Sequence, residues 1–377
     1  MVSTGTSPGP KRAIFPSPRP YEVLAAKNAT LRLRAPSGHV FSFTDLTSAS
    51  GAVNFGHLNP AIDPFASLAS DIAASFYPPA AASFADWLCG KLGLDAHTVL
   101  YQVGGVPAVS AAVDMARRTR PGNVLVIAGS SHDPRGNARN TRAGDSFQRI
   151  AAGTEFNAWD EVSCLVYEPI QGAGCSAPLP LPWLRSLSLA AQAAGVLAIA
   201  DEIQCGFFRF GSLSMAAGAY LQPDIFLFGN SMTNGIYPLT AVVCPAALGS
   251  AFLAGERRGE HTFQTASLGF QAADCVAKYI DSTDIERQVE QIHSILSQAG
   301  ERLAANPRLC SFHLAGPTLS LEVRDGRAGE LVKACEERCV LVGWGGGGRV
   351  RIAPPTTIPL EQLTSALKIV DQAADGL

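Results

Sequence analysis

Short apolar runs alternate with amphipathic stretches between about residues 100 and 245, and this alternation constrains the fold more than any other feature. The runs are rich in β-branched residues, and Gly, Pro or Asp bounds them. They are Val124–Ala128, Cys164–Tyr167, Val196–Ala200, Ile225–Phe228 and Thr240–Val243. Such runs are typical of strands buried on both faces. Helices are predicted between them, at Pro107–Thr119 and Trp183–Ala194, with Gly195 at the C-terminal end of the second. The pattern predicts an α/β fold with a mostly parallel sheet flanked by helices.

The pattern changes after about residue 255, which predicts a smaller α+β domain. A long polar helical region is expected over about 269–305 and a final helix over about 360–373. Between them the expected strands are Leu319–Val323, Val340–Trp344 and Arg349–Ile352. The first twenty residues are rich in Pro, Ser and Gly, so we expect a flexible arm and not a signal peptide. The predicted division is an N-terminal segment (1–40), a large domain (41–255) and a small C-terminal domain (256–377).

The composition argues against several classes of partner. A net charge of −3 gives no reason to expect binding to nucleic acid or to an anionic membrane. No stretch approaches the roughly 18 consecutive apolar residues that a membrane span needs. The nine cysteines are scattered without a Cys-x-x-Cys pair. We therefore expect free thiols in a reducing cytoplasm, with no disulfide and no metal site.

The segment Asp201–Gly211, which reads Asp-Glu-Ile-Gln-Cys-Gly-Phe-Phe-Arg-Phe-Gly, carries the strongest local signal. It follows the buried run Val196–Ala200, so Asp201 is expected at the carboxyl end of a parallel strand. Ligands of α/β sheets bind at that edge. A carboxylate there either caps the following turn or contacts a ligand, and this segment alone does not decide between the two.

Four motifs, in order along the chain, resemble those of class III (ω-type) aminotransferases, which are fold-type I enzymes that use pyridoxal phosphate (PLP). The motifs are Gly-His-x-x-Pro within Asn54–Pro60, Glu-Pro-Ile-Gln-Gly at Glu168–Gly172, the Asp201 segment, and Arg-Ile-Ala-Pro-Pro at Arg351–Pro355. The resemblance implies that Asp201 keeps the PLP pyridine nitrogen protonated and that Gln204 lies near the ring hydroxyl. It also implies that Glu168 lies in the cofactor site and that Arg351 holds a substrate carboxylate. A homodimer with its sites at the interface is expected.

Residue 230 is Asn where the resemblance leads one to expect lysine. The stretch Gly229–Leu239 resembles the family's lysine segment, in which a strand ends in Gly-Lys and a loop with Asn-Gly and Pro-Leu follows. In that family the lysine amine bonds covalently to PLP and later moves the proton. The amide of Asn230 is neither nucleophilic nor basic near neutral pH, so ordinary transamination is expected to be severely impaired. No lysine stands between Lys91 and Lys278, and both are expected on helices outside this loop.

The phosphate loop and the ring-stacking position also depart from the family's pattern. The family's Ser-Gly-(Thr/Ser)-Glu-Ala is replaced by Gly-Gly-Val-Pro-Ala, which loses both hydroxyls and, at Pro107, one N–H. Amides at the helix start are still able to bind a phosphate. Ser131 replaces the aromatic residue that stacks on PLP, and His132 is either an acid/base or a hydrogen-bonded loop residue. The predicted phosphate contacts are Gly104, Gly105 and Val106.

Two later segments differ as well. Ala173 stands where many members have a Glu that pairs with the carboxylate-binding Arg. The family lends a Thr to the phosphate of the neighbouring subunit, in a segment that continues Gly-Asn-Pro. Thr262 or Thr265 is expected to serve here, although the Gly-Asn-Pro turn is absent.

Three hypotheses remain open on the sequence. The first is an engineered Lys-to-Asn version of an active transaminase, which explains Asn230 but not the other departures. The second is a natural lysine-less enzyme, with or without a cofactor. In its cofactor-dependent form Asn230 binds pyridoxamine phosphate (PMP) by hydrogen bonds, His132 or His261 moves the proton, and the reaction resembles a PMP-dependent dehydration. The third is a non-catalytic protein, in particular a partner subunit of an active paralogue.

The retained Asp201 and Gln204 favour continued PLP or PMP binding, because an unpaired buried carboxylate is costly. The altered phosphate loop argues the other way. The favoured prediction is a class III aminotransferase-like homodimer that binds PLP or PMP and acts on a small amino or keto compound. Its expected catalytic residues are Asn230, His132 and Asp201, and ordinary transamination is impaired.

Overall fold

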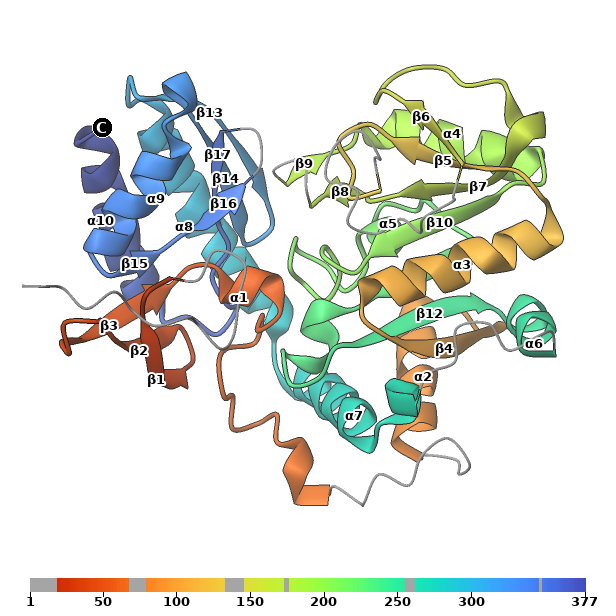
Figure 1. The fold of residues 1–377 in the computed structure, drawn as a ribbon, viewed down its shortest axis with the longest axis horizontal. Helices are drawn as coiled ribbons and strands as arrows, with labels where there is room; N and C mark the ends of the chain where they lie inside the picture. The colour runs from red at the N-terminus through yellow and green to blue at the C-terminus, as the bar shows by residue number, and fades with distance from the viewer. Residues whose placement is uncertain (1–18, 68–78, 133–145, 173–175, 255–261, 346–347) are drawn as a thin grey trace, which may run out of the picture.

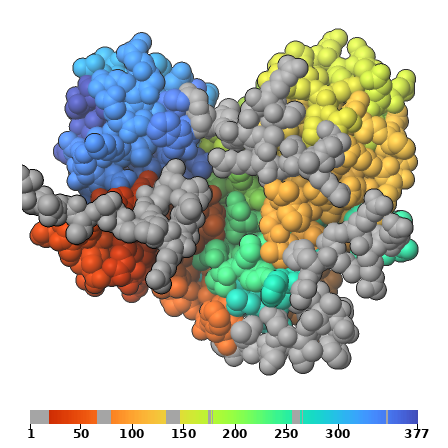
Figure 2. Space-filling model, viewed as in Figure 1, coloured from red at the N-terminus to blue at the C-terminus, as the bar shows by residue number. Residues whose placement is uncertain are grey.

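A computed structural model describes most of the chain as two lobes. The described residues are 19–67, 79–132, 146–172, 176–254, 262–345 and 348–377. One lobe holds the middle of the chain, and the other holds the N-terminal strands beside the C-terminal part, in red and blue (Figure 1). The same division is visible on the surface (Figure 2). The expected N-terminal arm falls largely outside the described residues.

The larger lobe is built on a seven-stranded sheet in which only one strand runs antiparallel to its neighbours. That strand is β12, which lies between β4 and β11. In spatial order the strands are β4 (His97–Val103), β12 (Leu239–Pro245), β11 (Ile225–Phe228), β10 (Leu197–Glu202), β7 (Val162–Tyr167), β5 (Asn123–Ile127) and β6 (Phe147–Ile150). The predicted mostly parallel sheet is confirmed. Strands β4 and β6 were not predicted, because they are the half-exposed edge strands and contain no fully apolar run.

Helices cover both faces of this sheet, which explains why its strands are apolar without alternation. Val124 and Val126 of β5 pack on the face covered by α3 (Gly105–Thr119). Leu125 and Ile127 pack on the opposite face, with α4 (Leu181–Ala193) and α2 (Pro79–Leu92). Helix α4 ends just before Gly195, whose φ of +71° is the left-handed conformation predicted for that glycine. Shorter helices are α5 (Met215–Gly218) and α6 (Ala246–Ala254).

The polar helical region predicted over about 269–305 consists of two helices. Helix α7 (Ser267–Ser282) ends at Thr283, which is extended, and Asp284 caps α8 (Ile285–Ala304) by accepting from the Arg287 amide at 3.1 Å. Phe270 and Val276 of α7 pack in the core of the large sheet, as do Ile285 and Val289 at the start of α8, whereas the rest of α8 packs in the core of the smaller lobe. The expected domain limits stay a prediction, and this packing would move the second limit into α8, between Val289 and Ile292.

The smaller lobe contains two four-stranded sheets. One is antiparallel and consists of β13 (Leu309–Ala315), β14 (Thr318–Val323), β17 (Arg349–Ile352) and β16 (Gly343–Gly345). The other joins β1 (Glu22–Lys27), β2 (Thr30–Arg34) and β3 (Val40–Asp45) to β15 (Val340–Leu341). Helices α8, α9 (Ala328–Glu337) and α10 (Leu360–Asp375) pack against them. The strand expected at 340–344 is therefore split between two sheets, and β1 to β3 were not predicted.

No helix in the described part of the chain is both long enough and apolar enough to cross a membrane.

Candidate active site

Four neighbouring strands of the large sheet end at one edge, and each end is followed by predicted site residues. The strands are β5, β7, β10 and β11. In register, Ala200 of β10 lies opposite Tyr167 of β7, and Asp201 lies opposite Leu227 of β11. The residues that follow these strand ends are Ser131 and His132, Glu168, Gln204, and Asn230. The parallel sheet therefore gathers the predicted site at its carboxyl edge, where such sheets bind ligands.

Asp201 and His132 form a buried pair at this edge. The Nε2 atom of His132 lies 2.8 Å from Oδ2 of Asp201, and their side chains are only 2% and 4% exposed. The other carboxylate oxygen, Oδ1, accepts a hydrogen bond from the Ile203 amide at 2.9 Å. Asp201 therefore caps the following turn, as one of the two interpretations predicted, and it also contacts an imidazole, while its contact with a ligand stays a prediction. The sequence had not paired His132 with it.

Hydrogen bonds to Glu168 connect the loop that contains Ser131 to the loop that contains Gly172. Its carboxylate accepts from the Ser131 amide at 2.7 Å, the Ser131 hydroxyl at 3.0 Å and the Gly172 amide at 3.2 Å. Burial raises the pKa of Glu168, and the charge of Asp201 adds to that effect, while His132 and the two amides oppose it. The Ser131 side chain is thus committed to Glu168 and provides no stacking surface.

Gly172 is required by the position of Gln204. A Cβ atom on Gly172 would lie 2.1 Å from Oε1 of Gln204, which is incompatible with any other residue unless Gln204 moves. The Glu-Pro-Ile-Gln-Gly turn therefore packs directly on the Asp201 segment, and Gln204 is half-buried between them.

The predicted phosphate loop forms the start of α3. Gly104 precedes the helix with φ +89°, and its amide donates to the Pro238 carbonyl at 2.7 Å. No side chain caps this helix end, and Val106 is 39% exposed. The first amides of a helix have no partner within the helix and favour an anion. Pro107 contributes no N–H, so the amides of Gly105 and Val106 are the ones that remain.

Asn230 begins the turn that follows β11. It has φ +45° and an exposed side chain. Its neighbour Ser231 is buried and donates to the Gly51 carbonyl at 2.6 Å. The two nearest lysines in sequence lie on helices, as expected: Lys91 pairs with Asp281 at 2.7 Å and Lys278 with Asp274 at 2.6 Å.

Arg351 lies on β17 in the smaller lobe, between Ser320 and Gly343 on the neighbouring strands. Arg209, which sequence analysis did not single out, is 3% exposed and reaches the segment just after Arg351. Burial, followed by the charge of Arg351, lowers the pKa of Arg209 to about 9. The only sequence signal for Arg209 was its place within the Asp201 segment.

The remaining predicted residues lie elsewhere or outside the described part. Thr262 and Thr265 bound a short 3-10 helix, and the exposed Phe263 between them accepts from the Tyr237 hydroxyl at 3.0 Å. Ala173 and His261 lie outside the described residues. His57 binds Asp45 at 2.8 Å and lines a cavity of about 210 Å³.

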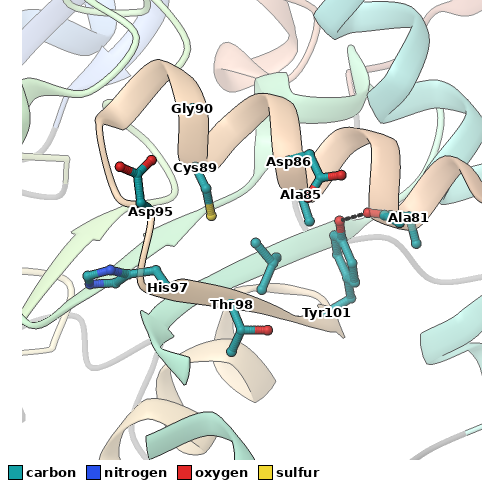
Figure 3. Close-up of a pocket in the computed structure, with 11 residues that line it drawn as sticks. Ala81, Ala85, Asp86, Cys89, Gly90, Asp95, His97, Thr98 and Tyr101 are labelled. Atoms are coloured by element: carbon teal, nitrogen blue, oxygen red, sulfur yellow. Dashed lines mark hydrogen bonds between the residues drawn. The ribbon is translucent and has the colours of Figure 1, made fainter. Parts of the chain in front are cut away.

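A larger cavity of about 480 Å³ lies between α2 and β4 and contains none of the predicted site residues. Figure 3 shows Asp86, Cys89, Asp95 and His97 around it. This cavity is distinct from the strand-end edge described above.

Comparison with known proteins gives one consistent result. Residues 122–374 match the family described as Aminotransferase class-III. The chain is 25% identical over 296 residues to acetylornithine aminotransferase of Methanothermobacter thermautotrophicus, covering 74% of this chain and 75% of that protein. It is 24% identical over 366 residues to the mitochondrial ornithine aminotransferase of Drosophila melanogaster, covering 87% and 82%.

Solved structures show the same fold. The crystal structure of acetylornithine aminotransferase from Elizabethkingia anophelis superposes with a TM-score of 0.82 at 23% identity, covering 97% of each chain. Ornithine aminotransferase from Toxoplasma gondii, solved with partial occupancy of PLP at its active site, gives 0.82 at 20% identity, covering 96% of this chain and 92% of that one.

Proposed function

Because this chain belongs to the class III aminotransferase family, we propose that it binds PLP or PMP without a covalent link and acts on a small amino or keto compound. The main observation in support of this proposal is the buried Asp201–His132 pair at the carboxyl edge of the large sheet. We also propose that ordinary transamination is impaired, because residue 230 is Asn and its amide cannot replace the lysine amine.

The donor set at this edge fits the ring and the phosphate of such a cofactor. Asp201 would hold the pyridine nitrogen, with Gln204 near the ring hydroxyl and the amides of Gly105 and Val106 toward the phosphate. When bound, the cofactor supplies an electron sink. The fit is supported by Asp201 itself, which is 4% exposed yet faces an imidazole and no Arg or Lys among the residues that the structure describes.

The chain's own residues then have separable roles. His132 holds Asp201 in position and shares a proton with it at Nε2. Glu168 fixes Ser131 against Gly172 and so shapes the same edge. Asn230 is able to donate or accept a hydrogen bond, but its amide does not take up a proton near neutral pH. Arg351 is proposed to bind a carboxylate of the substrate.

A non-catalytic partner subunit is the second candidate. It is supported by large apolar side chains that are exposed, namely Val106 at 39% at the start of α3 and Phe263 at 67%. A homodimer, or a heterodimer with a paralogue, would cover them. The substrates of the aminotransferase relatives suggest an amino acid or its keto counterpart.

Equilibrium titration of the purified protein with PLP and, separately, with PMP tests the proposal. Saturable micromolar binding is expected, with PLP released on dialysis because no covalent link forms. An Asp160→Asn variant, changed at an exposed surface carboxylate, is the matched control. Absence of binding to both would show that the site has lost the cofactor, and rapid multiple turnover with PLP would refute the impaired transamination.

A further inference from the structure

Arg209 is a buried cation whose hydrogen-bond acceptors are all uncharged. Its guanidinium donates to Ser48 Oγ at 3.2 Å and to the carbonyls of Ala353, Pro317 and Pro354 at 3.3, 3.3 and 2.8 Å. Burying a charge without a hydrogen-bonded counter-ion costs free energy. A buried arginine in such a place therefore indicates that its planar set of N–H donors has a structural or functional role.

The three carbonyls belong to the smaller lobe and Ser48 to the turn that follows β3, whereas Arg209 belongs to the larger lobe. Ala353 and Pro354 directly follow β17, the strand that carries Arg351. Residues of the smaller lobe also contact the backbone of the Arg209 segment. The Thr318 hydroxyl donates to the Arg209 carbonyl at 3.0 Å, and a Cβ on Gly316 would lie 2.3 Å from the Phe210 carbonyl carbon. The guanidinium therefore spans the junction of the two lobes.

A strained turn, residues 48–51, packs against the Arg209 side chain. Ser48, Ala49 and Ser50 have φ of +48°, +49° and +61°, a conformation that is rare for residues other than glycine. A Cβ on Gly51 would lie 3.4 Å from Cδ of Arg209. Ser48 also donates to the Ala353 carbonyl at 2.8 Å, and the Gly51 carbonyl accepts from Ser231, the residue after Asn230.

A continuous set of contacts thus joins both sides of the site. It runs from Ser231 to the turn 48–51, from that turn to Arg209, and from Arg209 to the residues that follow Arg351. Asp201 is connected to it through the chain, because Arg209 lies in the same short segment after β10.

We propose that Arg209 is a positioning residue: it holds Arg351 at a fixed place relative to Asp201 and Asn230, and so sets the affinity for a carboxylate-bearing substrate. This inference rests on the proposed function, in which Arg351 binds the carboxylate. Lysine keeps the charge but lacks the planar fork that reaches several acceptors at once, so Arg209→Lys is the informative substitution.

The test measures two affinities for each variant, that for PMP alone and that for 2-oxoglutarate in the presence of PMP, by calorimetry. Arg209→Lys is expected to weaken 2-oxoglutarate binding about tenfold, because a small displacement of a carboxylate clamp is costly, while PMP affinity stays within about twofold. Ser48→Ala, which loses one of the four acceptors, is expected to weaken it about threefold. The matched control is Arg185→Lys, since Arg185 is an exposed arginine that donates to the Ala219 carbonyl at 2.6 Å.

A double-mutant cycle separates positioning from general stabilisation. In an Arg351→Met background the effect of Arg209→Lys on 2-oxoglutarate affinity is expected to vanish, because Arg209 acts through Arg351. The inference would be overturned if Arg209→Lys weakened 2-oxoglutarate binding as much in the Arg351→Met background as in the wild type. It would also be overturned if Arg209→Lys weakened PMP binding equally, or if it left the affinity for 2-oxoglutarate at the wild-type value.

Amide hydrogen exchange gives a readout that needs no ligand. Arg209→Lys is expected to speed exchange in residues 46–53 and 348–354 and to leave β5 and β7 unchanged. If the wild-type protein binds neither PMP nor 2-oxoglutarate, the proposed function fails. The exchange rates in residues 46–53 and 348–354 then still test whether Arg209 holds these two segments in place. Exchange that is unchanged there would contradict it.

Discussion

The inner and outer halves of the candidate site differ in how firmly they are held. The inner half, consisting of Asp201, His132, Glu168 and Ser131, is buried, and His132 contacts Asp201 while Ser131 bonds to Glu168 at the ends of β5, β7 and β10. The outer half, consisting of Gly104–Pro107 and Asn230, has an exposed Val106, an exposed Asn230 and no side-chain cap on α3. The departures from the family's pattern that remove cofactor-binding groups lie mainly in the outer half. Under the proposed function, this difference predicts that Asp201 still binds the ring nitrogen while phosphate binding and covalent attachment are weakened.

The largest expected effect comes from removing the charge at the centre of the inner half. Asp201→Asn is expected to weaken PMP binding about 100-fold, or about 3 kcal/mol, because the ring nitrogen loses its ionic partner. Equilibrium titration measures it, with Asp160→Asn as the control. An Asp201→Asn protein that binds PMP as well as the control would break the comparison.

Glu202, next to Asp201, should make stability depend on pH. Burial raises its pKa from 4.5 to about 7, despite donors from Ser214, Met215 and Ala216. The folded state then holds a proton that the unfolded state releases, so this contribution to stability is full below about pH 4.5 and falls by about 3 kcal/mol as pH rises to about 7.

In Glu202→Gln that part of the pH dependence is expected to disappear. Urea unfolding at several pH values between 4.5 and 8 measures it, and Glu161→Gln, at a position exposed to solvent, is the control. A Gln variant with the wild-type slope would assign the pH dependence to another group.

Asn230→Lys tests the outer half directly. The substitution is expected to allow covalent attachment of PLP and to tighten PLP binding about tenfold, because the new amine adds a bond to a cofactor already held by Asp201. Mass spectrometry after borohydride reduction detects the adduct. The control is Asn157→Lys, at an exposed loop position. Equal labelling of both variants, or no labelling of Lys at 230, would contradict the proposed site.

Val106→Ser should have the smallest effect. The exposed position is able to accept a hydroxyl at the start of α3, where an added donor to phosphate is expected to tighten PMP binding about threefold. The titration should show no change for pyridoxamine, which has no phosphate. An equal gain for pyridoxamine would place the hydroxyl elsewhere than at the phosphate.

The elements that were predicted correctly are those with a local signal in the sequence. The five apolar runs became β5, β7, β10, β11 and β12, because burial on both faces leaves a mark on every residue of a strand. Asp201 was placed at a strand end for the same reason. The edge strands, β1 to β3 and the break at Thr283 left no comparable mark, since half-exposed strands and a single extended residue tolerate many sequences.

The sequence by itself determined the parallel sheet, the place of Asp201 at a strand end and the Asn at position 230, because these depend on periodicity and on residue identity. Only the tertiary structure decided that His132 meets Asp201, that Ser131 is bound to Glu168, and that Arg209 reaches the residues after Arg351. Those contacts join residues 37 to 145 positions apart. No local pattern encodes such distances, because the sheet register and the packing of the two lobes create them together.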